Sequence, residues 1–264
     1  MNMKKLLVLT FALLTVSCSE YQQALKSEDV KVKYDMAEKL YKEGKYKKAS
    51  RLFEQILPRY VGKPQGERVL FFHADAYFKN KDYYLAGYQF ERFSKSYPKS
   101  ERAEEAAFLG AQCYYMLSPR YSIDQTETVK AIDKLQNYID RYPNSLRIDE
   151  ANTLMSELQR KLEKKAFEIA KQYNTIRDYQ SAINAFDTFI ADYPGTPFRE
   201  QAQFYKLDSA YELAINSYDF VKKERLQTVQ TIYDSFARNY GESQFLEEAT
   251  AMNDEVTRQL QDFQ

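Results

Sequence analysis

Residues 83–98 read YYLAGYQFERFSKSYP, and this stretch carries the spacing that decides the fold. Ala86, Phe90 and Phe93 stand eleven, seven and four residues before Tyr97, and a proline follows the tyrosine. Apolar residues at these distances fall on one face of an α-helix, and proline is a helix stop signal. The stretch therefore predicts a helix with an aromatic face that ends at a Tyr-Pro pair.

The same pattern occurs five times along the 264-residue chain, at intervals of 37, 45, 51 and 47 residues. Each copy has a small residue, a large apolar residue and mostly an aromatic residue at the same three distances before a tyrosine. The tyrosines that close the five copies are Tyr60, Tyr97, Tyr142, Tyr193 and Tyr240. Repeats of this length are typical of arrays of helix pairs rather than of a compact enzyme core.

Small residues at matching places indicate how the two helices of a pair meet. The matching pairs are Ala37 with Ala49, Ala74 with Ala86, and Ala170 with Ala182. A side chain without bulk lets two helix axes approach to about 8 Å, so these positions predict close crossings. We therefore expect an all-α fold, a right-handed α-solenoid of about five helix pairs.

Breaks in the spacing divide the array. We predict three N-terminal repeats over residues 31–145, with an insertion over 117–127 (LSPRYSIDQTE). Residues 146–264 are expected to hold the C-terminal repeats four and five, preceded by one long helix over 146–174 that contains no Gly or Pro. Repeat five is also stretched, around 217–225. Insertions in repeat arrays often bind partners, although a tolerated surface loop is an equal alternative for each of them.

The N-terminus has the pattern of a targeting segment. Lys4 and Lys5 precede an apolar stretch over residues 6–16, which is too short to span a bilayer as a helix. Cys18 stands where this stretch ends, and we expect it to be the lipidated first residue of a lipoprotein. Residues 1–17 would then be the signal peptide and residues 18–30 the lipidated tether. An ordinary signal peptide cleaved nearby is the alternative.

Composition argues against several classes of function. Lys+Arg and Asp+Glu both total 38, so no bulk charge favours a nucleic-acid partner. His73 is the only histidine, which excludes His-based catalytic triads and two-histidine metal sites. Neither G-x-G-x-x-G nor the P-loop motif occurs. We expect no enzymatic activity, no cofactor and no metal, and we expect Cys113 to be a packed hydrophobic residue.

In a repeat array the first helix of each pair lines an inner face that commonly binds partners. Transferring the inward positions of such a repeat to this sequence predicts a substrate groove. Its lining would be Tyr34, Tyr41, Phe71, Asp75, Phe78, Lys79, Phe108 and Tyr115. Rings beside a few charges suit an extended peptide rich in aromatic residues. Packing against the next repeat is an equal alternative for each residue.

The spacing of Gly44, Tyr46, Ala49 and Phe53 resembles the tetratricopeptide repeat. The chain after Cys18 resembles the BamD family of outer-membrane assembly lipoproteins, in the form carried by Bacteroidota. The resemblance rests on the cysteine with its polar tether, on the YPxS-type ends at residues 97–100 and 142–145, and on the SPRYSIDQT segment at 118–126 with the long helix after it. Val61 and Gly241, where proline is expected, and Thr15 in the lipidation motif depart from the pattern.

The resemblance implies a non-enzymatic subunit of the β-barrel assembly machine. Such a subunit would be lipid-anchored in the outer membrane and would face the periplasm. It would bind unfolded outer-membrane proteins through its N-terminal repeats. Its C-terminal repeats would bind the periplasmic domains of the machine's barrel subunit.

Two other classes of protein remain open. One is a tetratricopeptide lipoprotein that serves as an adaptor for cell-wall machinery, which the sequence separates from the first only through the family resemblance. The other is a SusD-like glycan-binding lipoprotein. Those proteins are roughly twice as long and commonly bind sugars on tryptophan side chains, whereas this chain has no tryptophan.

Overall fold

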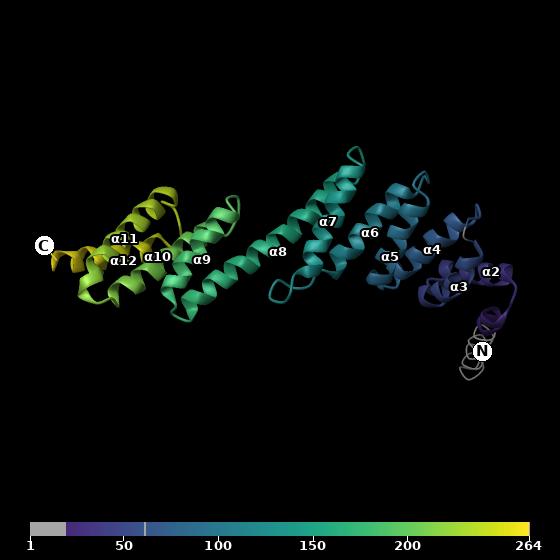
Figure 1. The fold of residues 1–264 in the computed structure, drawn as a ribbon, viewed down its shortest axis with the longest axis horizontal. Coiled ribbons are helices and arrows are strands. Elements are labelled where there is room, and N and C mark those ends of the chain that lie inside the picture. The colour runs from purple at the N-terminus through teal and green to yellow at the C-terminus, as the bar shows by residue number, and fades with distance from the viewer. Residues whose placement is uncertain (1–19, 61, 264) are drawn as a thin grey trace, which may run out of the picture. The chain divides into compact units, whose positions relative to one another are not determined.

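The computed structural model describes residues 20–60 and 62–263, and every regular element in those ranges is a helix. A short helix over residues 20–26 precedes the labelled helices (Figure 1). These are α2 (Val30–Lys42), α3 (Tyr46–Tyr60), α4 (Gly66–Lys79), α5 (Tyr83–Ser96), α6 (Ala103–Leu117), α7 (Thr126–Arg141), α8 (Ile148–Thr175), α9 (Tyr179–Asp192), α10 (Arg199–Ile215), α11 (Asp219–Asn239) and α12 (Leu246–Gln261). The predicted all-α repeat fold is confirmed. The predicted signal peptide and Cys18 lie outside the described residues.

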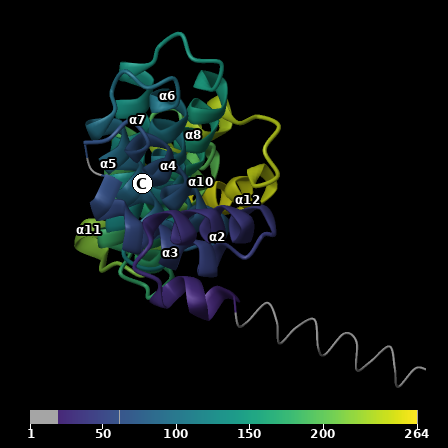
Figure 2. The same cartoon turned by 90° about the vertical axis from the view of Figure 1, so that its right-hand side faces the viewer.

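The chain forms two compact units. The first ends at Leu158 and excludes residues 120–123; the second comprises those four residues and everything from Gln159 onward. The division falls inside α8, whereas the predicted boundary at 145/146 lies just before this helix. Within the first unit, α2 and α3 lie side by side in both views, and α4 to α7 continue the stack (Figure 1, Figure 2).

The predicted helix crossings are built on alanine. Ala37, Ala49, Ala74 and Ala86 are all fully buried. The α5 and α6 helices also approach closely, because a Cβ added at Gly110 would lie 3.3 Å from the Cβ of Phe90. Glycine and alanine therefore set the distances between helices, while phenylalanine fills the space on either side.

In three of the helix pairs the turn between the two helices uses one left-handed residue. Gly44 occupies this position between α2 and α3 with φ of 74°, and Lys81 occupies it between α4 and α5 with φ of 64°. Arg177 has φ of 63° between α8 and α9. The turns that lack the glycine thus keep the same geometry. Each does so at a conformational cost of about 1 kcal/mol for its left-handed residue.

Helix α8 contributes to two cores. Ala151 and Leu158, in its first half, pack with Leu135 of α7. Phe167 and Ala170, in its second half, pack with helix α9. One helix thus closes the first unit and opens the second. No helix in the described ranges combines the length and apolar character that crossing a bilayer would require.

Candidate functional site

The serine that follows three of the Tyr-Pro or Tyr-Gly pairs connects two repeats. After Tyr193-Pro194 the cap is a threonine, Thr196, which accepts a hydrogen bond from the Phe198 N–H. Ser100, Ser145 and Ser243 each accept a hydrogen bond from the backbone N–H two residues later, as helix caps do. Each also donates its hydroxyl to a glutamate in the preceding helix pair, in the first turn of that pair's first helix. The bonds are Ser100–Glu67 at 2.5 Å, Ser145–Glu104 at 2.6 Å and Ser243–Glu200 at 2.6 Å. We call these three bonds the serine–glutamate ties.

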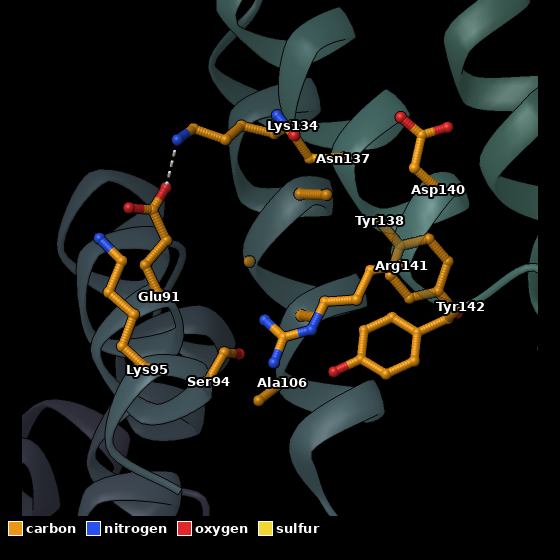
Figure 3. A pocket seen from close by; sticks show the side chains of 13 residues that line it. Glu91, Ser94, Lys95, Ala106, Lys134, Asn137, Tyr138, Asp140, Arg141 and Tyr142 are labelled. Carbon is orange, nitrogen blue, oxygen red and sulfur yellow. Dashed lines mark ion pairs between the residues drawn. The ribbon is translucent and has the colours of Figure 1, made fainter. Parts of the chain in front are cut away.

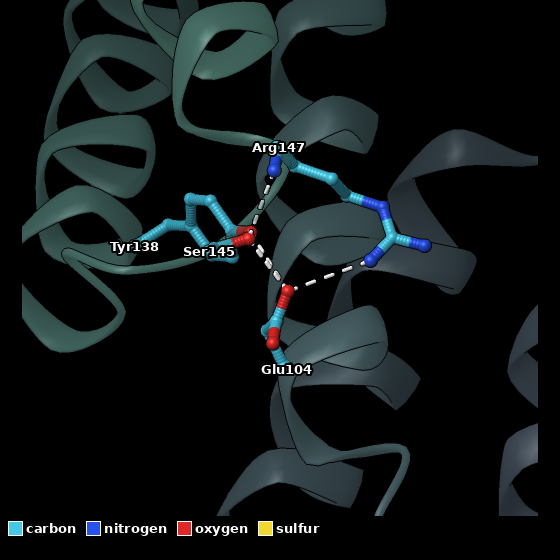
Figure 4. A network of polar contacts seen from close by, with 4 residues as sticks. All are labelled: Glu104, Tyr138, Ser145 and Arg147. Atoms are coloured by element: carbon cyan, nitrogen blue, oxygen red, sulfur yellow. Dashed lines mark hydrogen bonds and ion pairs between the residues drawn. The ribbon is translucent and has the colours of Figure 1, made fainter.

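The tie at Ser145 belongs to a larger network (Figure 4). Glu104 accepts from the Ser145 hydroxyl and lies 3.5 Å from the Arg147 guanidinium. The Tyr138 hydroxyl lies 2.6 Å from the Ser145 oxygen. Burial raises the pKa of Tyr138, so this hydroxyl stays protonated and available for the bond. The network joins α6, α7 and the start of α8.

Two residues after each cap, a side chain covers a buried ring of the preceding helix pair. The ring belongs to that pair's first helix. We call the place of the covering side chain the cover position. Arg102 lies over Phe71 at 4.6 Å and Arg147 over Phe108 at 5.6 Å. In the second unit the position holds phenylalanine: Phe198 stacks on Phe167 at 5.5 Å and Phe245 on Phe204 at 4.4 Å. The cover is therefore cationic in the first unit and aromatic in the second.

Three of the predicted groove residues form one polar cluster between α2 and α4. The Tyr41 hydroxyl donates to the Asp75 carboxylate, and Lys79 Nζ lies 2.6 Å from the Tyr41 oxygen and 3.0 Å from Asp75. Burial and the hydrogen bond to Asp75 raise the pKa of Tyr41 to about 12. Burial opposes ionisation of Lys79, but its bonds to Tyr41 and Asp75 raise its pKa overall. The three groups satisfy one another and hold two repeats together.

The structure corrects the placement of Phe71, Phe108 and Asp75. Phe71 is only 4% exposed and Phe108 only 3%, because each lies under a cover residue. Asp75 is 7% exposed. These side chains therefore belong to the packing between repeats and do not line an open groove.

The other predicted groove residues are half-buried. Tyr34 packs against Tyr60, and Phe78 packs against Tyr83 and Phe90. The Tyr115 hydroxyl donates to Glu157 of α8, within the first unit. Their rings keep an exposed edge, but each also makes a contact between helices.

Sequence reasoning missed Phe72, the neighbour of Phe71. Its ring is half-buried, with the Arg68 guanidinium at 5.6 Å and the Arg102 guanidinium at 5.4 Å. Arg68 also forms an ion pair with Glu38 of α2. The available signal was the i, i+4 spacing of Arg68 and Phe72, which places both on one face of α4.

A hollow of about 490 Å³ lies between α5 and α7 (Figure 3). Its floor is α6, which presents only small residues there, Ala106, Ala107, Gly110 and Ala111. The walls carry polar side chains, among them Glu91, Ser94 and Lys95 of α5 and Lys134 and Arg141 of α7. The volume is within the range of about 300–1,000 Å³ that is typical of ligand sites.

One ion pair crosses this hollow. Lys134 Nζ of α7 lies 3.0 Å from the Glu91 carboxylate of α5 and 5.3 Å from the centre of the Tyr114 ring. Burial, followed by a hydrogen bond with Glu91, raises the pKa of Tyr114. The two charged residues line the hollow, and the Tyr114 ring lies beside Lys134.

The two residues most often linked to chemistry are both buried in the first unit. Burial raises the pKa of the Cys113 thiol to about 12, so it stays protonated. His73 is 2% exposed, and burial followed by the nearby Arg92 charge lowers its pKa to about 4. Over residues 20–60 and 62–263, no cluster of three or more His, Cys, Asp or Glu side chains is placed to hold a metal ion. The arrangement of rings and paired charges suits protein binding.

A family model described as YfiO, outer membrane lipoprotein, matches residues 26–226. Among curated proteins none matches the chain. Two solved structures of TPR-like repeats from a putative kinesin light chain of Podosopora anserina are 16% identical to it, each with a TM-score of 0.33. The first, which carries a single substitution, covers 82% of this chain and 98% of its own; the second covers 81% and 99%. At that TM-score neither likeness carries an argument about function or shape.

Proposed function

Since the chain belongs to the YfiO family of outer membrane lipoproteins, we propose that it is a scaffold subunit of the machine that assembles β-barrel proteins in that membrane. The family match, over residues 26–226, carries the proposal. The helix-pair repeats support it, because such arrays present extended surfaces for binding proteins. The role is non-catalytic: the protein positions its partners.

In this proposal Cys18 carries the lipid, and the chain faces the periplasm. Several acyl chains anchor a protein firmly, whereas a single chain anchors weakly. The intact mass should match residues 18–264 plus acyl groups, and Cys18→Ala should release the protein from membranes. A mature N-terminus found elsewhere by sequencing would remove the anchor from the proposal.

The N-terminal repeats would bind unfolded barrel proteins through the exposed edges of their inner-face rings. Phe72 replaces Phe71 as the central ring, because Phe71 is buried and Phe72 is not. Tyr115 on α6 is a second half-buried ring of the predicted inner face, in the next repeat. Two cations beside Phe72 would orient the polar backbone or a carboxylate of an extended segment.

A pair of substitutions tests this binding face. Phe72→Ala with Tyr115→Ala should weaken binding of a barrel-strand peptide at least tenfold, since an aromatic hot spot typically contributes about 2 kcal/mol. Phe220→Ala is the matched control, because this ring is 85% exposed in the second unit. Fluorescence anisotropy measures the affinity, and circular dichroism checks the fold. A folded double variant that binds like wild type would leave the protein as a scaffold alone.

The C-terminal repeats would bind the periplasmic domains of the barrel subunit. A pull-down of the lipidated protein from native membranes tests the whole assignment. We expect an outer-membrane barrel with periplasmic domains among the captured proteins. A cell-wall hydrolase in its place would favour the adaptor alternative, and a glycan transporter would favour the SusD-like alternative.

A further inference from the structure

The hollow between α5 and α7 is separate from the inner face considered above, because its walls are the second helices of two pairs. Each wall is part of a longer stripe at helical spacing. On α5 the stripe is Tyr84, Tyr88, Glu91 and Lys95; on α7 it is Lys130, Lys134, Asn137 and Arg141. Both stripes follow i, i+4, i+7, i+11, so each continues beyond the hollow along one face of its helix.

A buried hydroxyl in this hollow has no hydrogen-bond partner. Ser94 is 7% exposed, and its Oγ makes no hydrogen bond to any described residue. In Figure 3 this hydroxyl points into the hollow, on the side from which the Arg141 guanidinium enters. A buried hydroxyl without a hydrogen-bond partner is unfavourable, so a bound group that accepts from Ser94 is favoured.

Two cations beside Ser94 are also without a partner of opposite charge. Within the described part of the chain, neither Lys95 nor Arg141 forms an ion pair with a carboxylate. Of the two acids in the lining, Glu91 is paired with Lys134, and Asp140 accepts a hydrogen bond from Gln136. In Figure 3 the Asp140 carboxylate lies above Tyr138 and away from Ser94, Lys95 and the Arg141 guanidinium. The free charge of the hollow is therefore positive.

The rest of the groove is apolar and open. Its floor is four alanine and glycine residues, so a side chain entering from solvent meets no bulk. Beyond the hollow, Tyr84 and Tyr88 of α5 are 73% and 59% exposed, and Val129 of α7 is 55% exposed. Exposed rings beside a hollow are the usual anchors of a protein interface.

We propose that this groove binds an acidic segment of a partner protein whose carboxylates alternate with apolar side chains. One carboxylate accepts hydrogen bonds from Arg141 and Ser94, with Lys95 beside it. The apolar side chains of the segment lie on the α6 floor and against the tyrosines. Charge complementarity selects an acidic segment. The floor of small residues leaves room for apolar side chains, and a phosphate group alone would leave that room empty.

The test uses the full-length protein in detergent and two labelled 12-residue peptides. One alternates Asp with Leu, and the other alternates Asn with Leu. We expect the Asp peptide to bind at least tenfold more tightly than the Asn peptide. Arg141→Ala should weaken its binding at least fivefold. Ala107→Leu should weaken it as much without changing any charge, because it fills the floor.

Arg59→Ala is the matched control, since Arg59 is an exposed arginine at the end of α3, outside the hollow. It should bind the Asp peptide like wild type. If Ala107→Leu does not fold, Ser94→Ala removes the unpaired hydroxyl without adding volume and should weaken binding several-fold. Equal affinity for both peptides, or equal losses in Arg59→Ala and Arg141→Ala, would overturn the proposal. Binding of anionic phospholipid vesicles that depends on Arg141, with no peptide binding, would also overturn it.

Discussion

The two units cover the same buried ring in different ways. In the first unit Arg102 and Arg147 lie over Phe71 and Phe108, and Arg147 also lies beside the Glu104 carboxylate. In the second unit Phe198 and Phe245 stack on the equivalent rings. A guanidinium keeps its charge in water while its plane covers the ring, whereas a phenylalanine must itself be sheltered. One position in the repeat can therefore join repeats through charge or through apolar contact.

The largest expected effect comes from removing the covered ring itself. Phe71→Ala and Phe204→Ala should each lower the free energy of unfolding by about 3–5 kcal/mol, because each creates a cavity in a core. Phe204→Ala should cost more, since it also removes the surface on which Phe245 stacks at 4.4 Å. Denaturant unfolding followed by circular dichroism measures both. Equal losses would show that the kind of cover does not matter.

Acid should affect the two units in opposite directions. In the first unit His73 has its pKa lowered from 6.5 to about 4, first by burial and then by the charge of Arg92. Glu54 of α3 lines a second, separate hollow together with His73 and Arg92. As the pH falls, His73 is protonated in the unfolded chain before it is protonated in the folded protein. The free energy of unfolding is therefore full above pH 6.5 and falls toward pH 4. The loss is about 3 kcal/mol. In the second unit, burial and the charges of Glu212 and Glu248 raise the pKa of Asp208. The contribution of Asp208 to the free energy of unfolding is therefore full at low pH and is lost as the pH rises.

Denaturant midpoints between pH 4.5 and 7.5 measure this contrast. His73→Gln should flatten the acid loss, and Asp208→Asn should remove the opposing slope. Both substitutions keep a polar side chain of similar size. A His73→Gln profile that still follows wild type would show that another group titrates in the first unit.

Exchanging the cover residues tests the comparison directly. Phe245→Arg should lower the stability of the second unit by about 1–2 kcal/mol, because stacked aromatic area is replaced by a solvated cation. Arg102→Phe in the first unit should make stability less sensitive to salt, since it replaces a charge with a ring. Thermal unfolding at low and high salt measures both. A salt response that does not change in Arg102→Phe would contradict the cationic role.

The smallest effect should come from a serine–glutamate tie. Ser145→Ala removes a helix cap and the bond to Glu104, and should cost about 1 kcal/mol. Ser243→Ala should cost about the same in the second unit, because both units use the tie. Ser122→Ala, in an exposed loop, is the control in the same measurement. A much larger loss at one serine would show that the ties are not equivalent.

The sequence predicted those features that depend on one helix at a time. The spacing before each tyrosine located the second helices, and the absence of Gly and Pro over 146–174 agrees with α8 at Ile148–Thr175. The bonds of the cap serines to the preceding repeat were not predicted, because a hydrogen bond between two repeats depends on how their helices stack.

The inner face was harder to predict, because it depends on how each helix is rotated in the stack. Phe71 and Phe72 differ by about 100° around the helix, so an error of one position in the assumed rotation of α4 exchanges the buried ring for the half-buried one. The sequence predicted Phe71 for the groove, and the structure buries it under Arg102. The hollow between α5 and α7 gave no signal, since alanine and glycine in α6 indicate close packing as readily as an open floor.

The serine–glutamate ties also bear on the order in which the chain can fold. Each tie joins residues 33, 41 or 43 positions apart. Arrays whose contacts reach only the neighbouring repeat can nucleate at one end and grow, and contacts that are local in sequence favour fast folding. A chain that crosses a membrane from its N-terminus could therefore complete each repeat as soon as the next forty or so residues emerge. Export and folding would then proceed together, and little apolar surface would be exposed at any moment.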